Sequence, residues 1–243
     1  MSNGTAAAAH PDMASFVLVH GAWGGGWTFD RLAGELSMAG HQVLVAELTG
    51  LGKQRDRLHP GITLTDHIDD VCDQVAAAGF DRFILAGHSY GGMVITGVAT
   101  RLGARIDALA YLDAFLPGDG QSLWDITGDH EHRHYIDTQK HTPGLVAPII
   151  GEESERLGRH PLLSLVEAVC FTGEEAKVPL RAYVFATGWE PTPFRRFAHA
   201  VKDDPDWLYH EAASGHDVMA GQPGQILEIM LGLAAQSFSS RRS

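Results

Sequence analysis

A serine flanked by glycines stands in Gly87-His88-Ser89-Tyr90-Gly91, directly after an apolar run and before a helical pattern. In a tight strand-to-helix turn, small residues two positions before and after the serine let neighbouring segments pass closely, and the strained backbone projects the hydroxyl. The helix N-terminus and the Tyr90 amide would then face an oxyanion developing beside Ser89. The motif predicts a nucleophilic serine; the alternative is a glycine-rich turn with an incidental serine.

A second glycine-rich loop follows the first apolar run. It reads His20-Gly21-Ala22-Trp23 and continues to Trp27. Glycine there lets a backbone N–H approach a substrate oxygen, so the Ala22 amide is the second expected oxyanion donor, beside that of Tyr90. Trp23 and Trp27 are expected to wall a substrate pocket. Alternatively, this is a simple turn with core tryptophans.

His216 is the candidate base. It lies in a loop of small residues after the last apolar run and before the final helical pattern. There it could take the proton from Ser89 and later donate it to the leaving group. The alternative is a solvent-facing loop histidine.

Two carboxylates could orient the base. Asp113 immediately follows one apolar run, and Glu190 lies just past another. Either could hold the imidazole in the right tautomer and stabilise its charged form. The unused carboxylate would be a supporting hydrogen-bond partner.

Short apolar runs alternate with longer amphipathic ones, which predicts an α/β fold with a mostly parallel sheet flanked by helices. Parallel sheets bind ligands beyond the carboxyl ends of their strands, so the candidate residues should meet there. Strands are expected over 16–20, 43–47, 83–87, 106–112, 180–186 and 207–211, and helices over 29–39, 65–78, 90–102, 193–201 and 222–237.

The alternation fails over 116–178, where only 162–169 is predicted to be helical. We expect a cap inserted into a core formed by 13–115 and 179–243, with Trp124 among the apolar side chains facing the substrate. The alternative is an insertion that packs only on itself. His130, His132 and His134 alternate in this stretch and would share one face if the chain were extended, but we interpret them as part of a solvated surface loop and predict no metal.

Composition narrows the function classes. The 243 residues are 44% hydrophobic and 20% charged, with a formal net charge of −12, which disfavours binding to nucleic acid or anionic membranes. Two distant cysteines, Cys72 and Cys170, are expected to be reduced thiols of a cytoplasmic protein. No apolar run reaches the ~18 residues of a membrane span. Residues 1–12 are expected to be a flexible tail, and a monomer and a homodimer both remain open.

Together these segments resemble the α/β-hydrolase superfamily over nearly all of 16–237. Phe16-Val-Leu-Val-His-Gly-Ala-Trp, Gly87-His-Ser-Tyr-Gly-Gly-Met and Gly215-His-Asp-Val-Met resemble the branch of plant methyl esterases and hydroxynitrile lyases with their bacterial relatives. The segment 111–117 is similar to the one that carries the acid in some haloalkane dehalogenases and cofactor-free dioxygenases. This similarity tilts the choice slightly to Asp113, although Glu190 occupies the commoner acid position of the fold.

The resemblance implies cleavage of a small ester or amide without a cofactor. Bacterial relatives include hydrolases of man-made carbamates such as carbendazim. The lyases carry a lysine six residues past the base, where this chain has Gln222, which argues against a lyase. We predict a serine hydrolase acting on a small, apolar or aromatic ester or carbamate through an acyl-enzyme. A cofactor-free lyase or oxygenase, and a small-molecule receptor with little turnover, are the alternatives.

Overall fold

A six-stranded parallel sheet forms the centre of the protein, seen here in a computed structural model that describes residues 13–242. The predicted tail, 1–12, lies outside the described residues. The strand order is β10-β9-β4-β3-β1-β2, so the chain starts near one edge and crosses to the other. All six predicted strands are present, with ends shifted by no more than two residues: β1 Ser15–Val19, β2 Gln42–Ala46, β3 Phe83–Ser89, β4 Ile106–Ala114, β9 Arg181–Ala186 and β10 Leu208–Ala212.

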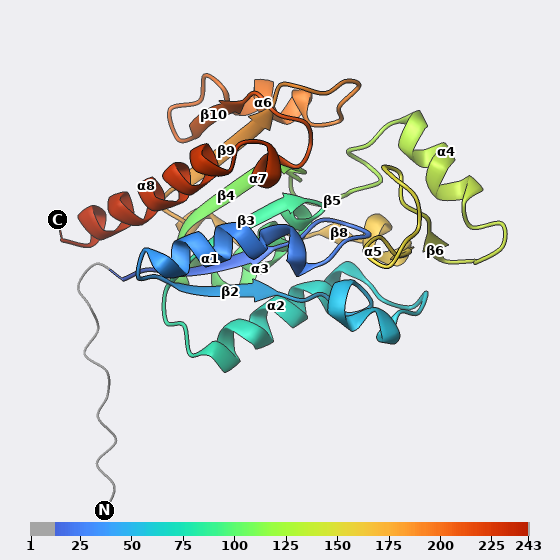
Figure 1. The fold of residues 1–243 in the computed structure, drawn as a ribbon, viewed down its shortest axis with the longest axis horizontal. Helices are drawn as coiled ribbons and strands as arrows, with labels where there is room; N and C mark the ends of the chain where they lie inside the picture. The colour runs from blue at the N-terminus through green and yellow to red at the C-terminus, as the bar shows by residue number, and fades with distance from the viewer. Residues whose placement is uncertain (1–12, 243) are drawn as a thin grey trace, which may run out of the picture.

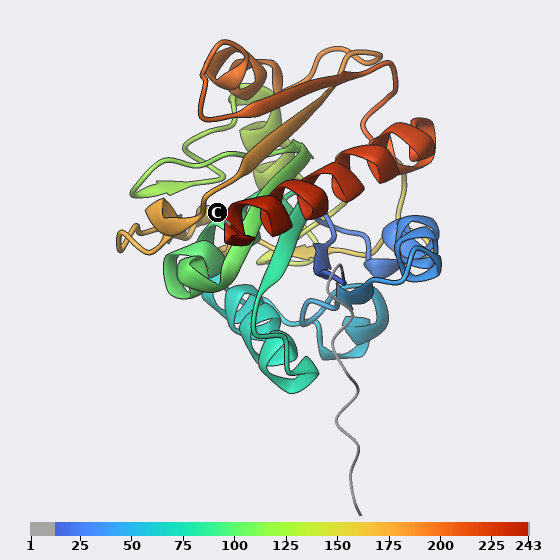
Figure 2. The ribbon, with the colours of Figure 1, turned by 90° about the vertical axis from the view of Figure 1, so that its left-hand side faces the viewer.

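Both faces of the sheet are covered by helices. Along β1, Phe16 and Leu18 point into one apolar layer and Val17 and Val19 into the other, as the two-residue period of a strand requires. Helices α1 and α8 pack on the first layer, and α2, α3 and α6 on the second. Figure 2 shows α8 in red crossing in front of the strands. The main helices are α1 Asp30–Met38, α2 Leu64–Ala78, α3 Gly91–Leu102, α6 Arg195–Val201, the short α7 Val218–Gly221 and α8 Pro223–Arg242.

Local signals define the ends of these helices. Thr63 caps α2 by accepting from the Asp66 amide, while Asp66 accepts from the Thr63 amide, and Gly79 ends α2 with a left-handed φ of 69°. Four short 3-10 helices complete the connections: η1 Gly26–Phe29, η2 Gly52–Arg57, η3 Gly103–Arg105 and η4 Glu175–Lys177.

The insertion, residues 116–178, connects β4 to β9. In Figure 1 the arrowheads of β2 and β3 point toward the side of the molecule where α4, β6 and α5 lie. The insertion therefore lies beyond the carboxyl ends of the strands. Its elements are β5 Gln121–Ser122, α4 Asp129–Asp137, β6 Leu145–Val146, β7 His160–Pro161, α5 Leu163–Val166 and β8 Ala168–Val169, with β5 pairing to β8 and β6 to β7.

Two expectations for the insertion are wrong. The predicted helix over 162–169 shrinks to α5, because Glu167 turns extended and the next two residues pair with β5. The expected solvated loop at His130–His134 is instead helix α4, started by Asp129 and by Glu131, whose carboxylate accepts from the Gly128 amide at 3.0 Å. On a helix alternate residues lie ~200° apart, so the three histidines do not share one face.

Candidate active site

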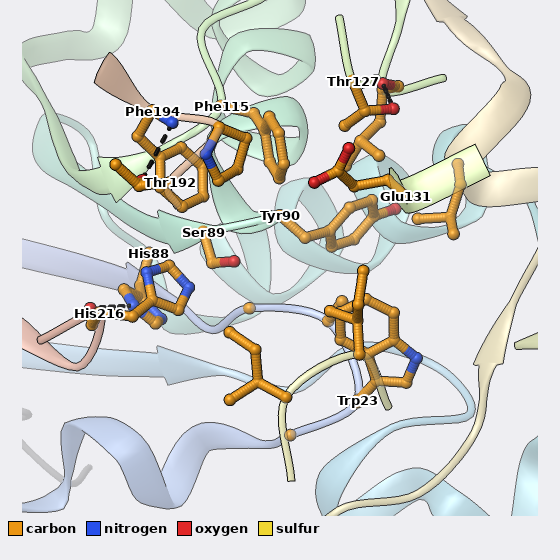
Figure 3. Close-up of a pocket in the computed structure, with 18 of the residues that line it drawn as sticks. Trp23, His88, Ser89, Tyr90, Phe115, Thr127, Glu131, Thr192, Phe194 and His216 are labelled. Atoms are coloured by element: carbon orange, nitrogen blue, oxygen red, sulfur yellow. Dashed lines mark hydrogen bonds between the residues drawn. The ribbon is translucent and has the colours of Figure 1, made fainter. Parts of the chain in front are cut away.

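Ser89 ends β3 at the sharp turn that the sequence predicts. Its φ is 56°, a left-handed conformation that few side chains adopt. Both motif glycines are required by close contacts. A Cβ on Gly87 would lie 2.6 Å from the Gly91 carbonyl oxygen, and one on Gly91 would lie 2.5 Å from the Val19 carbonyl oxygen. A side chain at either position would collide with the neighbouring backbone, so this turn requires glycine at both. The Ser89 side chain lines a cavity (Figure 3).

His216 lines the same cavity, in the loop that follows β10. Its Nδ1 lies 2.8 Å from Oδ2 of Asp113. The ring of Phe194 stacks on the imidazole with centroids 5.0 Å apart, and Trp189 approaches at 4.9 Å. His88 fixes the loop itself, because its Nε2 donates to the His216 carbonyl oxygen at 3.0 Å. With Nδ1 donating to the carboxylate, Nε2 of His216 becomes the proton-accepting nitrogen.

Asp113 is the extra residue of a bulge in β4. His88 of β3 pairs with Leu112 and Ser89 pairs with Ala114, so Asp113 is skipped by the register and takes a φ of 44°. The bulge turns its fully buried carboxylate toward β9 and the His216 loop.

Three donors hold this carboxylate. Oδ1 of Asp113 accepts from the Ala186 amide at 3.0 Å, and Oδ2 accepts from the indole N–H of Trp189 at 3.1 Å as well as from His216. Burial raises the pKa of Asp113 to about 6, against the lowering effect of the hydrogen bonds from Ala186 and Trp189. Burial also lowers the pKa of His216 to about 4, so the imidazole is neutral at pH 7 and able to accept a proton.

Glu190, the other predicted acid, lies in a different environment. Its side chain is 53% exposed and its carboxylate pairs with Arg195, although the residue lines the cavity. The structure thus brings Asp113 to His216 and directs the carboxylate of Glu190 to a surface arginine.

The two predicted oxyanion donors flank Ser89. Ala22 and Tyr90 both line the cavity, and Tyr90 precedes the first residue of α3, whose dipole adds positive potential there. The loop carrying Ala22 packs directly on the serine, since a Cβ on Gly21 would lie 3.0 Å from the Ser89 Cβ. Glycine at 21 is what permits this approach.

The cavity has a volume of about 890 Å³ and a predominantly apolar lining. Trp23 and Trp27, the predicted pocket residues, line this cavity. Trp124 is absent from the described lining residues: its ring stacks on His132 at 3.9 Å, which turns it into the packing between β5 and α4. The insertion contributes other apolar side chains to the lining: Leu123, Ile126, Tyr135, Ile149, Ile150, Leu157 and Leu165.

Sequence reasoning missed Trp189 and Phe194 around the imidazole. Trp189 directly precedes Glu190 in the sequence. Its contacts with His216 and Asp113 depend on where Asp113 lies in space, which the sequence does not reveal. Phe194 lies in the segment predicted as a helix. The nearby aromatic residues Trp189 and Phe197 are the one feature of the sequence that points to an aromatic cluster there.

The chain is similar to known proteins over most of its length. Residues 16–229 match the model of the alpha/beta hydrolase family. The chain belongs to this family. A carbendazim hydrolyzing esterase from Nocardioides sp. (strain SG-4G) is 38% identical over 242 residues, covering 91% of this chain and 100% of that protein. Family membership and this full-length relative named as an esterase make the chain a hydrolase.

More distant similarities agree with the α/β-hydrolase assignment. Salicylic acid-binding protein 2 of Nicotiana tabacum is 31% identical over 129 residues, which cover 51% of this chain and 50% of that protein. The solved structure of an extracellular α/β-hydrolase from a Paenibacillus species superimposes with a TM-score of 0.77 at 22% identity, covering 90% of this chain and 98% of that one. The superposition on the Paenibacillus structure establishes that the two proteins share a fold.

The described residues form neither a metal-binding cluster nor a membrane-spanning helix. Within residues 13–242, no three His, Cys, Asp or Glu side chains are grouped as a metal site would require. None of the helices in this part of the chain combines the length and apolar character of a membrane span.

Proposed function

We propose that this α/β-hydrolase is a serine esterase that cleaves small, apolar or aromatic carboxylic esters or carbamates, with Ser89, His216 and Asp113 as its catalytic triad. The observation that carries the proposal is the 2.8 Å contact between His216 Nδ1 and the buried Asp113 carboxylate, in a loop that lines the same apolar cavity as Ser89. The full-length similarity to a carbendazim hydrolyzing esterase supports the carbamate part of the substrate class.

In the first half-reaction, Ser89 Oγ attacks the substrate carbonyl carbon while Nε2 of His216 takes its proton. The negative charge on the carbonyl oxygen is stabilised by the amides of Ala22 and Tyr90. Collapse of the tetrahedral intermediate breaks the bond to the leaving group, which receives the proton from His216. Asp113 keeps the imidazole oriented and stabilises its transient positive charge.

In the second half-reaction, His216 removes a proton from water, which attacks the acyl-Ser89 carbonyl carbon. The same amides stabilise the new oxyanion, and the proton returns to Ser89 as the acid or carbamic acid departs. None of these steps requires a cofactor.

The insertion 116–178 acts in this proposal as a cap on a core of 13–115 and 179–243. Its apolar residues supply a large part of the cavity wall, so we propose that it selects for apolar and aromatic substrate groups. We also propose that the enzyme works in the cytoplasm, where its free thiols, Cys72 and the exposed Cys170, would stay reduced. Both a monomer and a homodimer fit the proposal, since the predicted site lies within one chain.

The test is the Ser89→Ala variant. It should lose covalent labelling by an aryl organophosphonate, detected as an intact-mass increase of one adduct, and should lose at least about 10³-fold in kcat on aryl acetates and carbendazim. Ser37→Ala, on the exposed surface of α1, is the matched control and should label and turn over like the parent. Turnover by Ser89→Ala at the parental rate, or a parent that releases less than one product per chain, would refute the proposal.

A further inference from the structure

Trp23 is held by three hydrogen bonds, and all three lead to the insertion. Its indole N–H donates to the Val146 carbonyl oxygen at 3.0 Å, its carbonyl oxygen accepts from the Gly158 amide at 2.9 Å, and its own amide donates to Nδ1 of His160 at 3.4 Å. Trp23 also has a left-handed φ of 62°. A bulky residue adopts that conformation only when its surroundings impose it. The insertion therefore fixes the backbone immediately after Ala22.

His160 is the buried member of this set. Its side chain has no exposed surface, and its Nε2 lies 2.8 Å from Oγ of Ser164. The Ser164 hydroxyl donates its single hydrogen to the Pro161 carbonyl oxygen at 2.8 Å, so it must accept from His160. The proton of the neutral ring is thus on Nε2, and Nδ1 is left as the acceptor that the Trp23 amide needs. Burial, which holds the pKa of His160 well below its ordinary value, maintains this neutral form.

His160 also contacts the other predicted oxyanion residue. The edge of one ring meets the face of the other between His160 and Tyr90, with centroids 4.7 Å apart at 73°. The Tyr90 hydroxyl is anchored in turn by Nδ1 of His67 at 2.8 Å, since Nε2 of His67 donates to the Thr49 carbonyl oxygen. His160 therefore packs against Tyr90, which bears one predicted oxyanion amide. It also accepts a hydrogen bond from Trp23, the residue that follows Ala22 and its predicted oxyanion amide.

We propose that His160 is a positioning residue that aims the Ala22 and Tyr90 amides at the developing oxyanion, so that seating of the insertion completes the oxyanion hole. This inference rests on the proposed esterase function. Because a misaimed donor weakens binding of the transition state more than binding of the substrate, loss of His160 acts on kcat and leaves KM nearly unchanged.

The first variant is His160→Leu, which keeps the side-chain bulk and removes both ring nitrogens. We expect kcat for an aryl acetate to fall about 10- to 100-fold, less than the 10²- to 10³-fold typical of deleting a donor outright, with KM changed by less than about threefold. A trifluoromethyl ketone, which forms an oxyanion adduct with the serine, should lose affinity by the same factor as kcat. The matching methyl ketone, which binds without charge, should keep its affinity.

Two variants distinguish positioning from general structural damage. His160→Asn retains an acceptor oxygen near the position of Nδ1 and should recover most of the difference in affinity between the two ketones. His134→Leu is the matched control, because His134 lies in the same insertion and its Nε2 donates to the Ala147 carbonyl oxygen at 2.8 Å. It should leave that difference unchanged.

If His160→Leu fails to fold, a cycle with Ser164→Ala decides the question. Ser164→Ala removes the group that fixes the proton on Nε2 of His160, so it should reduce kcat about three- to tenfold in the parent. In the His160→Asn background it should have no such effect, because asparagine has no tautomer to fix. A folded His160→Leu protein with parental ketone discrimination, or an equal Ser164→Ala effect in both backgrounds, would overturn the inference. An active Ser89→Ala protein would instead refute the underlying esterase proposal.

Discussion

Two carboxylates, Asp113 and Glu190, lie at the carboxyl ends of neighbouring strands of one sheet, in opposite environments. Asp113, on β4, is fully buried and accepts three hydrogen bonds. Glu190, just beyond β9, is half exposed and pairs with Arg195 on the surface. The difference arises from register and not from position along the chain, because the bulge at residue 113 turns its side chain inward.

Burial suits one of these carboxylates to the role of triad acid that we propose for it. In low dielectric, the charge of Asp113 interacts strongly with an imidazolium at His216, whereas the charge of Glu190 is screened by water. Burial raises the pKa of Asp113, so an ionised carboxylate there carries an energetic cost, which is typical of functional groups.

The largest expected effect comes from Asp113→Asn. The side-chain shape is retained, but an amide can present a donor to His216 Nδ1 and so favour the wrong tautomer. By analogy with serine proteases, kcat should fall about 10⁴-fold, with KM changed little. Stopped-flow or extended-time assays on an aryl acetate measure this loss.

Glu190→Gln is the paired control for that variant and should retain parental kcat. If instead Glu190→Gln were the inactive protein and Asp113→Asn the active one, the assignment of the acid would be reversed.

The pH profile gives the next largest effect. As the pH falls through the pKa of Asp113, about 6, the dyad takes up a proton, and the charge that stabilises an imidazolium at His216 disappears. Because His216 Nδ1 lies 2.8 Å from the carboxylate, this proton belongs to the pair and not to either residue alone. We expect kcat/KM to fall about tenfold per pH unit below pH ~6. An identical acidic limb in Asp113→Asn would contradict this origin.

The core of this fold is readable from its sequence because buried parallel strands are nearly continuous apolar runs. All nine residues of β4 are buried, and the apolar residues of 106–112, interrupted by Asp107, predict most of it. The nucleophile turn is equally local: Gly87 and Gly91 are required by contacts within the turn and with β1.

The remaining features depend on contacts between distant segments. Strands of two residues, such as β5 and β8, have no periodicity, and Trp124 faces its neighbour His132 only because α4 folds beside it. The choice between Asp113 and Glu190 depends on one skipped residue in a strand pair. Single-sequence patterns contain no record of register, so the sequence alone does not show which of the two lies beside His216.

A smaller effect is expected from Trp189→Phe, which keeps a ring beside His216 and removes the N–H that donates to Asp113. This hydrogen bond lowers the pKa of the carboxyl, so its loss should raise that pKa and shift the acidic limb of kcat/KM to higher pH. We expect kcat at pH 7 to fall about three- to tenfold. Trp207→Phe, whose ring lies 5.7 Å from Tyr111, is the control and should leave the limb in place. A loss of kcat in Trp189→Phe without any shift of the limb would indicate packing alone.

The smallest effect is expected from changes to Glu190 and its surface partner Arg195. Glu190→Gln breaks only the ion pair with Arg195, which is exposed on both sides at 53% and 48%. Exposed pairs contribute less than about 1 kcal/mol, so the free energy of unfolding in urea should change by no more than that, and kcat by less than about twofold. The same small change should follow from Arg195→Gln, and the double variant should add little, because the two side chains then have no charge to lose. A drop in kcat that appears in Glu190→Gln but not in Arg195→Gln would mean that the Glu190 carboxylate acts on the reaction itself, and the contrast with Asp113 would no longer hold.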